Sequence, residues 1–304
     1  MGTRQKMTLD QVAIAKFLTW IAHTPRKVSE ITERFGWSSS DITFLSQQLL
    51  EEGCILSQEG DLWALTDSKG MGGFTLFWRC QVPLLYVPSC ESTNTVAAQI
   101  LHEGMPVQLI VSDFQTKGRG RLGRVWNANN AENLLFSLLL QPDVPIDQMA
   151  RCTLLWGAEI ADELGLHVKW PNDIVDSAGR KVGGILTELL NVGTPNQRVV
   201  FGFGLNVNQL EFPDDLPNAI SLRLLRDHVI QDRAALCGRL VQRILRTDVR
   251  RDLDLWRQRT LMLGQLVQAG NTVGIAQEIR EDGTLIVDGK AVLAGDVNMI
   301  SEVK

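Results

Sequence analysis

The order of helical and strand-like segments along the 304 residues predicts an α+β fold with three domains. Residues 8–66 contain three helical patterns and a hairpin signal, and residues 75–262 mix strands and helices without regular βαβ alternation. After residue 263 the pattern consists of short strands separated by turn signals. We therefore predict an N-terminal domain over 1–66, a linker over 67–74, a central mixed-sheet domain over 75–262 and a C-terminal β-domain over 263–304.

The composition is that of a globular protein and excludes several classes. Hydrophobic residues make up 44% and charged residues 21%, and the net charge is −5, which excludes intrinsic disorder as the main state. No apolar run approaches the roughly 20 residues of a membrane span, and the start lacks a signal-peptide h-region. The five cysteines include no Cys-x-x-Cys pair, which argues against zinc ribbons and disulfide frameworks. We expect a cytoplasmic protein without a membrane partner.

The N-terminal domain has the pattern of a winged helix-turn-helix. Apolar residues repeat at helical spacing after a Thr8–Gln11 capping box, and a second helical pattern ends at Gly36. A third helix opens with a Ser38–Asp41 box, and turn residues 59–61 indicate a hairpin. Three helices followed by a hairpin is the order of a winged helix-turn-helix, a DNA-binding motif.

The charge of this domain does not favour DNA. Residues 1–66 contain six Lys or Arg and eight Asp or Glu, a net charge of 6 − 8 = −2, and the third helix (residues 39–52) contains neither Lys nor Arg. The candidate DNA-binding residues are Arg26, Lys27, Ser46 and Gln47, with Arg34 and Gln48 beside them. An interaction or packing module is the alternative interpretation.

Apolar runs predict the elements of the other two domains. In the central domain we expect strands at 84–87, 108–112, 133–140, 185–189 and 199–203, and helices at 95–102, 148–164 and 233–256. In the C-terminal domain we expect strands at 266–267, 272–276, 285–287 and 291–293. Turn signals separate these last strands, which is typical of a small β-barrel.

A segment rich in glycine and arginine, here called the cationic loop (residues 115–126), carries the strongest chemical signal. Its glycines and cations are Lys117, Gly118, Arg119, Gly120, Arg121, Gly123 and Arg124. Glycines let backbone N–H groups approach an anion, and guanidinium groups add charge and directed donors. The glycine spacing matches the dinucleotide-binding motif, but no helical pattern follows it, so we reject that interpretation. We expect the loop to bind phosphates or a carboxylate.

Four shorter segments add candidate site residues, and each also has a purely structural interpretation. The turn at 169–173 ends in Asp173, a carboxylate that can hold a metal–phosphate or accept a proton. Lys181 precedes a double glycine that enters an apolar strand, and alternating glycines in 202–206 form a flat floor for a ligand. Residues 92–94 open a helical pattern, where capping is the default role.

Taken together and in order, these segments resemble the biotin protein ligases. The motifs that carry the resemblance are Ser92-Thr93-Asn94, Gly-Arg-Gly-Arg-x-Gly-Arg at 118–124, Lys-Trp-Pro-Asn-Asp at 169–173, Lys-x-x-Gly-Ile-Leu at 181–186 and Gly-x-Gly-x-Asn at 202–206. The resemblance implies a class II synthetase-like central domain and an SH3-like C-terminal domain. The N-terminal domain resembles the subgroup that also represses the biotin operon.

The resemblance implies a reaction in two steps. Biotin and Mg²⁺–ATP form biotinyl-5′-AMP and pyrophosphate, and a lysine of the biotin carboxyl carrier protein of acetyl-CoA carboxylase then displaces AMP. The other implied partners are operator DNA and a second copy of the chain in a ligand-promoted homodimer.

The resemblance also assigns roles to residues. The implied biotin-binding residues are Ser92, Thr93, Asn94, Gln115, Arg119, Gly120, Arg121, Lys181, Gly184 and Gly204. The implied ATP-binding residues are Arg119, Arg121, Arg124, Trp126, Lys181 and Asn206. The implied catalytic residues are Lys181, Arg119, Arg121 and Asp173, and Asp173 is also the candidate metal ligand. One departure is Leu122, which stands where repressor members often carry another arginine.

Two alternatives are open at this point. A lipoate–protein ligase shares the catalytic fold, but the cationic loop and the C-terminal β-domain argue against it. A ligand-sensing transcription factor without catalysis is the other, and the presence of Lys181 and Asp173 argues weakly against it.

Overall fold

A computed structural model describes residues 11–21, 24–51, 54–68, 71–128, 131–145, 148–194, 196–293 and 295–300. Within these ranges the predicted α+β class and central sheet are confirmed. The chain divides into two compact units, Met1–Tyr86 with Asp232–Arg239, and Val87–Gln231 with Leu240–Lys304. The domain boundaries given above stay predictions. None of the helices in the described ranges is long and apolar enough to cross a membrane.

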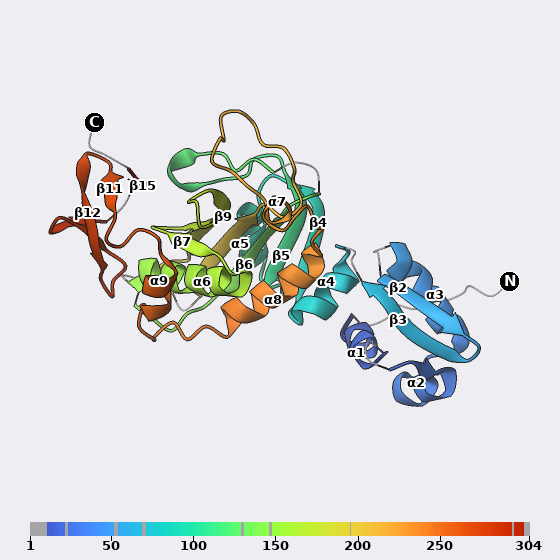
Figure 1. Ribbon diagram of the computed structural model, residues 1–304. Helices are drawn as coiled ribbons and strands as arrows, with labels where there is room; N and C mark the ends of the chain where they lie inside the picture. Colours follow the sequence, from blue (N-terminus) through green and yellow to red (C-terminus); the bar gives the residue numbers. More distant parts are fainter. Residues whose placement is uncertain are drawn as a thin grey trace. The chain divides into compact units, whose positions relative to one another are not determined.

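The first unit contains short helices and a small sheet, blue to cyan in Figure 1. Its elements are α1 (Gln11–Ile21), β1 (Arg26–Lys27), α2 (Val28–Phe35), α3 (Ser39–Glu51), β2 (Cys54–Glu59), β3 (Leu62–Ser68) and α4 (Gly73–Cys80), and the strands follow the order β1-β3-β2. Buried apolar side chains such as Phe17, Ile42 and Trp63 form its core. The predicted order of helices and hairpin is therefore present among these elements.

Local signals explain where these helices begin and end. α2 ends at Gly36, whose φ of 70° is a left-handed conformation that glycine adopts at little steric cost. α3 begins with the expected reciprocal cap, in which the Ser38 amide donates to Asp41 Oδ2 (2.8 Å) and the Asp41 amide donates to Ser38 Oγ (3.3 Å). The capping box at Thr8 lies outside the described residues.

Both ends of the segment expected to be a linker belong to secondary-structure elements. β3 extends to Ser68 and α4 begins at Gly73. The glycines before α4 indicate a linker by composition, but Leu76 is buried and Trp78 packs against the core of the unit. Tertiary packing therefore forms a helix that the local composition did not predict.

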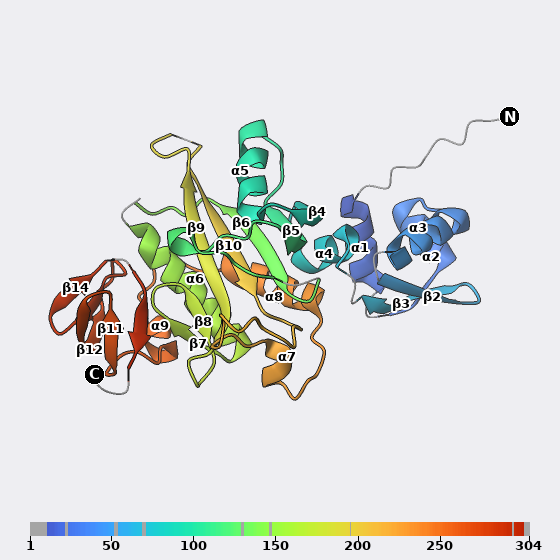
Figure 2. The ribbon, with the colours of Figure 1, turned by 90° about the horizontal axis from the view of Figure 1, so that it is seen from above.

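The second unit contains a seven-stranded sheet in the order β4-β5-β6-β10-β9-β8-β7. Its strands are β4 (Leu84–Cys90), β5 (Leu109–Gln115), β6 (Leu134–Leu140), β7 (His167–Lys169), β8 (Asp173–Val175), β9 (Lys181–Leu190) and β10 (Arg198–Leu205). The helices are α5 (Thr93–Glu103), α6 (Met149–Leu164), α7 (Leu222–Leu225), α8 (Arg233–Leu245) and α9 (Asp254–Arg259). Figure 2 shows the long strands β9 and β10, which pair antiparallel. β4 and α8 cross the division between the units.

The helix predicted over 233–256 is two helices, so that prediction is wrong in its length. α8 ends at Leu245 and α9 begins at Asp254. Between them, the buried Arg151 guanidinium donates hydrogen bonds to the carbonyl groups of residues 249, 250 and 251. Because these carbonyls are bound by a distant side chain, the apolar pattern of the segment could not reveal the break.

The C-terminal residues form a five-stranded sheet, red in Figure 1, in the order β14-β13-β12-β11-β15. The strands are β11 (Leu266–Ala269), β12 (Thr272–Ile279), β13 (Leu285–Val287), β14 (Lys290–Val292) and β15 (Val297–Met299). The four predicted strands are confirmed, and β15 is an addition. β15 pairs antiparallel with β11, which gives that strand a neighbour on each side.

Candidate functional site

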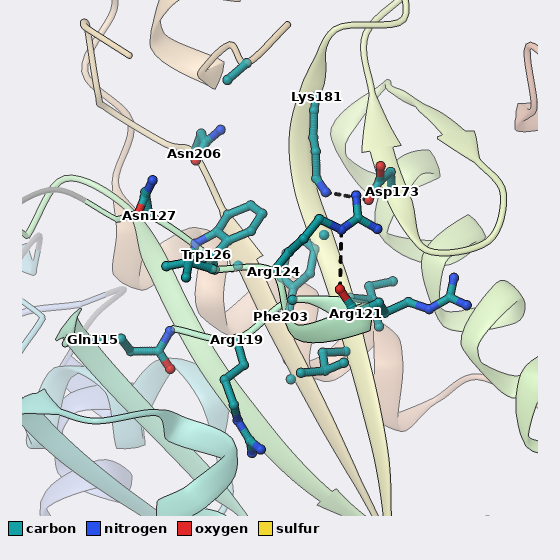
Figure 3. Close-up of a pocket in the computed structure, with 18 of the residues that line it drawn as sticks. Gln115, Arg119, Arg121, Arg124, Trp126, Asn127, Asp173, Lys181, Phe203 and Asn206 are labelled. Atoms are coloured by element: carbon teal, nitrogen blue, oxygen red, sulfur yellow. Dashed lines mark hydrogen bonds and ion pairs between the residues drawn. The ribbon is translucent and has the colours of Figure 1, made fainter. Parts of the chain in front are cut away.

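A cavity of about 260 Å³ lies where the cationic loop meets β9 and β10 (Figure 3). The residues that the sequence analysis assigned to biotin, ATP and catalysis all line it: Ser92, Thr93, Asn94, Gln115, Arg119, Gly120, Arg121, Arg124, Trp126, Asp173, Lys181, Gly184, Gly204 and Asn206. The sheet therefore brings segments together that are up to about a hundred residues apart in the sequence.

The floor of the cavity is made of glycines. Gly184 of β9 pairs with Gly204 of β10, and Gly202 lies two residues before Gly204 on the same face. A Cβ atom at Gly204 would lie 2.5 Å from the Trp126 indole, and one at Gly202 would lie 2.1 Å from Asn94 Oδ1. Because a side chain would clash at both positions, glycine is what allows other groups to lie directly on this backbone.

One end of the cavity holds a network of buried polar groups. Gln115 Oε1 accepts hydrogen bonds from the Thr93 amide (2.7 Å) and from Thr93 Oγ1 (3.1 Å). Ser137 Oγ lies 2.7 Å from Thr93 Oγ1 and donates to Asn94 Oδ1 at 2.6 Å. Ser92 precedes α5 as its N-cap residue, but its side chain makes no capping hydrogen bond. The default capping role is therefore not what this serine performs here.

At the other end, a lysine and a carboxylate form an ion pair. Lys181 Nζ lies 2.7 Å from Asp173 Oδ1, and 5.6 Å from the centre of the Trp126 ring (Figure 3). The main chain fixes the lysine from both directions, since its amide donates to Asn218 O (2.6 Å) and its carbonyl accepts from the Ile220 amide (2.9 Å). The cavity therefore presents one cation at a defined place above the glycine floor.

The cationic loop is folded back on itself as a small hairpin. The Gly120 amide donates to Arg124 O (2.7 Å), and the Trp126 amide donates to Gly118 O (2.9 Å). Leu122 lies at the tip with φ of 56°, an unusual conformation for a leucine, and is 73% exposed. The Gly120 N–H group, which the sequence analysis assigned to a carboxylate, is thus bound within the loop.

The arginines of the loop point to separate partners. Arg119 pairs with Glu188 (3.0 Å) and Arg124 pairs with Asp296 (2.5 Å). The Arg121 guanidinium donates to Asn172 Oδ1 at 3.4 Å, and burial lowers its pKa from the usual value. Figure 3 shows the Arg119 side chain directed away from Lys181. The structure brings the three arginines to the rim of one cavity but does not converge their guanidinium groups.

Trp126 and Asn206 lie at the floor, and they differ in whether their side-chain N–H groups are hydrogen-bonded. Asn206 is buried, and its side-chain amide donates to Ile220 O at 3.2 Å. The indole nitrogen of Trp126 is buried and has no hydrogen-bond partner among the described residues. A buried N–H without a partner is uncommon in folded proteins.

The described residues do not fit a metal site held by the protein alone. No group of three or more His, Cys, Asp or Glu side chains gathers in the described part of the chain. Asp173 is a single carboxylate, and it already pairs with Lys181. Magnesium is commonly bound by one or two carboxylates together with substrate phosphates, and only that arrangement is compatible with this site.

Sequence reasoning missed several groups at the cavity. Glu188 and Ser137 bond predicted site residues, and residues 209–219 contribute further lining side chains. Gly202 lies within the quoted Gly-x-Gly-x-Asn motif, so its signal was visible, whereas a glutamate in an apolar strand gives no local sign of its partners. Their roles depend on contacts across the sheet.

The candidate DNA-binding residues lie in the first unit. The Arg26 guanidinium lies 4.6 Å from the centre of the Trp20 ring and pairs with Glu30 (3.7 Å). Lys27 is exposed at the N-cap of α2, and Gln47 is exposed on α3. Ser46 Oγ donates to Thr43 O, so this hydroxyl is bound within its own helix. Of the two proposed base-contacting residues, Gln47 is therefore the one whose side chain is exposed, while the Ser46 hydroxyl is hydrogen-bonded within its helix.

Comparison with known proteins agrees with this geometry. Residues 86–206 match the Biotin/lipoate A/B protein ligase family. The bifunctional ligase/repressor BirA of Bacillus subtilis is 32% identical over 245 residues, which cover 71% of this chain and 74% of that protein. The chain belongs to the biotin protein ligase family.

Two other members of the family are also similar to this chain. The biotin–acetyl-CoA-carboxylase ligase of Mycobacterium tuberculosis is 33% identical over 215 residues, 62% of this chain and 77% of that protein. The structure of the biotin protein ligase from Aquifex aeolicus in complex with biotin and ATP superposes with a TM-score of 0.60 and 26% identity, and covers 72% of this chain and 98% of that one. The central fold is thus that of a biotin protein ligase.

Proposed function

We propose that this chain activates biotin with ATP and transfers it to a lysine of the biotin carboxyl carrier protein of acetyl-CoA carboxylase. The observation that carries the proposal is the position of Lys181, fixed above the glycine floor in a cavity lined by every predicted ligand-binding residue. Membership of the biotin protein ligase family supports the same reaction.

In the first step a biotin carboxylate oxygen attacks the α-phosphorus of ATP, and the bond to pyrophosphate breaks. Both reactants are anions, so their approach is opposed by charge repulsion. The Lys181 ammonium group offsets this repulsion where the carboxylate and the α-phosphate meet. In the second step the acceptor amine attacks the acyl carbon, loses a proton and displaces AMP, and Asp173 orients that amine. Mg²⁺ accompanies the ATP phosphates and neutralises part of their charge.

We assign the two ligands to different ends of the cavity. The biotin head group lies among Ser92, Thr93, Asn94 and Gln115, and it reaches Gly184 and Gly204 after the Trp126 ring, which lies against both glycines, has moved. Trp126 and Asn206 contact the nucleotide, and Arg119, Gly120, Arg121 and Arg124 surround the carboxylate and phosphates, with Arg119 acting through its backbone N–H group. Because the Gly120 amide donates to Arg124 O, the hairpin of the cationic loop must open before Gly120 can bind a carboxylate.

The ligase proposal is tested by release of AMP and pyrophosphate with biotin or lipoate, with and without a carrier domain. We expect release with biotin only, and biotinyl-lysine on the carrier. Release with lipoate instead would support the lipoate ligase, and tight binding of biotin without release would support a ligand sensor.

Gly202→Ala is expected to weaken biotin binding about tenfold, since overpacking of this kind costs about 1–3 kcal/mol. The new Cβ atom would lie 2.1 Å from Asn94 Oδ1 and displace that amide from the head-group site. Titration calorimetry with biotin measures the change. Gly73→Ala is the control, because the nearest atom to its Cβ is 4.0 Å away. An unchanged Kd in the folded Gly202→Ala variant would contradict the assigned biotin site.

We also propose that the N-terminal elements form a winged helix-turn-helix that binds operator DNA as a ligand-promoted homodimer, and that β11–β15 form an SH3-like barrel. The names of the Bacillus relatives as ligase/repressors support the first part. The N-terminal elements carry few cations, so we expect their affinity for DNA to depend on Arg26, Lys27 and Arg34.

The repressor proposal is tested by the mobility of operator DNA at low salt. We expect a shift that biotin plus ATP strengthens, and that Arg26→Ala or Lys27→Ala weakens by a similar factor on all sequences. Absence of any shift at low salt would contradict DNA binding. The mass of the chain in solution, with and without both ligands, tests the homodimer separately.

A further inference from the structure

One carboxylate joins two parts of the cavity that belong to different segments. Glu188 lies on β9 and is 32% exposed. Its Oε2 atom accepts a hydrogen bond from Asn94 Nδ2 at 2.6 Å and another from the Arg119 guanidinium at 3.0 Å. Asn94 belongs to the start of α5, whereas Arg119 belongs to the cationic loop. The same oxygen therefore connects the head-group end of the cavity to the cationic loop.

The bond from Asn94 sets the orientation of its amide. Asn94 Nδ2 donates to Glu188 and to Leu186 O (3.3 Å), while Oδ1 accepts from Ser137 Oγ. A reversed amide would place its oxygen 2.6 Å from a carboxylate oxygen, and two acceptors repel at that distance. The Oδ1 atom also lies next to Gly202 on the glycine floor. Glu188 therefore holds the acceptor side of this amide toward Gly202, which lines the cavity.

The bond to Glu188 holds the Arg119 guanidinium at the edge of the cavity. The side chain is 48% exposed, pairs with Glu188 and points away from Lys181 (Figure 3). A guanidinium held in this way anchors the first residues of the cationic loop to β9. Lys181, Arg121 and Arg124 are then the side chains left to face ligand anions.

We propose that Glu188 is a positioning residue of the biotin site, which turns the Asn94 amide oxygen toward the ligand and anchors the cationic loop through Arg119. The inference rests on the proposed function, because biotin carries a cyclic urea. The two N–H groups of that urea need acceptors, and Asn94 Oδ1 has a lone pair left after the bond from Ser137. Glu188 itself contacts no ligand in this arrangement.

Biotin-dependent pyrophosphate exchange in the full chain tests the inference, with biotin and ATP varied separately. Glu188→Gln keeps an oxygen for Asn94 but loses the charge that holds Arg119, and we expect the KM for biotin to rise about fivefold. Glu188→Ala loses both bonds, and we expect a rise of about thirtyfold. We expect the KM for ATP and kcat to stay within about twofold in Glu188→Gln. Glu91→Gln is the matched control, because Glu91 also pairs with a cation of the loop, Lys117 (2.7 Å), but at an exposed position where little effect is expected.

A double-mutant cycle with Arg119→Gln separates positioning from general damage. If Glu188 acts through Arg119, Arg119→Gln raises the KM for biotin in the wild-type chain but adds less than twofold in the Glu188→Gln background. Thermal unfolding of Glu188→Gln, which has the same shape as the natural residue, shows whether the fold is intact. This variant keeps the test valid if Glu188→Ala does not fold.

The inference would be overturned by a KM for biotin unchanged in both variants, by equal changes in kcat and both KM values, or by additive effects in the cycle. A lower KM in Glu188→Gln would also overturn it, since a released Arg119 would then bind the biotin carboxylate itself. Failure of the proposed function looks different, because the wild-type chain would then show no biotin-dependent exchange at all.

Discussion

Lys181→Ala is expected to lower biotin-dependent pyrophosphate exchange about 10³-fold. The ammonium group is the fixed cation above the glycine floor, and loss of one preorganised group at a developing charge typically costs a factor of 10²–10³. The substitution also leaves Asp173, otherwise paired at 2.7 Å, as an uncompensated negative charge beside two anionic reactants. We therefore expect the fall in kcat/KM to be at the upper end of that range.

Two further variants make this expectation specific. Asp173→Asn in the Lys181→Ala background removes the uncompensated carboxylate and is expected to restore part of the lost rate. Lys290→Ala, at an exposed position on β14, is the control and is expected to have the activity of the wild-type chain. Near-normal exchange by Lys181→Ala would remove this residue from the reaction.

Gly204→Ala is expected to have the second largest effect, a loss of about 10²-fold in kcat/KM for ATP. Its Cβ atom would lie 2.5 Å from Trp126 Cε2 and 2.7 Å from the indole nitrogen. An indole is rigid and cannot yield as a flexible chain end does, so the ring must leave the floor. Removal of that ring takes away the proposed contact surface for the nucleotide.

The measurement is steady-state kinetics at varied ATP with saturating biotin, accompanied by thermal unfolding. Gly73→Ala is again the control, because its Cβ has room. A Gly204→Ala variant that is folded and has a normal KM for ATP would contradict the assignment of Trp126 to the nucleotide.

Much of the fold could be predicted from sequence because local signals agreed with the tertiary structure. The φ of 70° at Gly36 and the reciprocal cap of Ser38 and Asp41 fixed helix ends that were visible in the sequence. By contrast, α4 and the break after Leu245 depend on contacts with distant residues, namely the core around Trp78 and the Arg151 guanidinium. Neither contact can be recognised from the sequence around α4 or after Leu245.

The candidate site shows the same division. Residues within motifs, such as Lys181 and Gly204, were identified because a lysine before a double glycine and alternating glycines in a strand are patterns that predict a ligand site. Glu188 was missed because its partners, Asn94 and Arg119, are 94 and 69 residues away in the sequence. The hairpin conformation of the cationic loop could also not be predicted from the sequence, since the bond from the Gly120 amide to Arg124 O depends on how the loop folds.

The central claim is that one cavity holds biotin and ATP side by side over the glycine floor, after the hairpin of the cationic loop has opened. A crystal structure with biotin and a non-hydrolysable ATP analogue tests it most directly. We expect biotin over Gly204 with its carboxylate beside Lys181, and the Gly120 amide turned from Arg124 O toward the ligand. Both ligands bound with the Gly120–Arg124 bond intact, or the arginines at 119–124 remote from both, would contradict the claim.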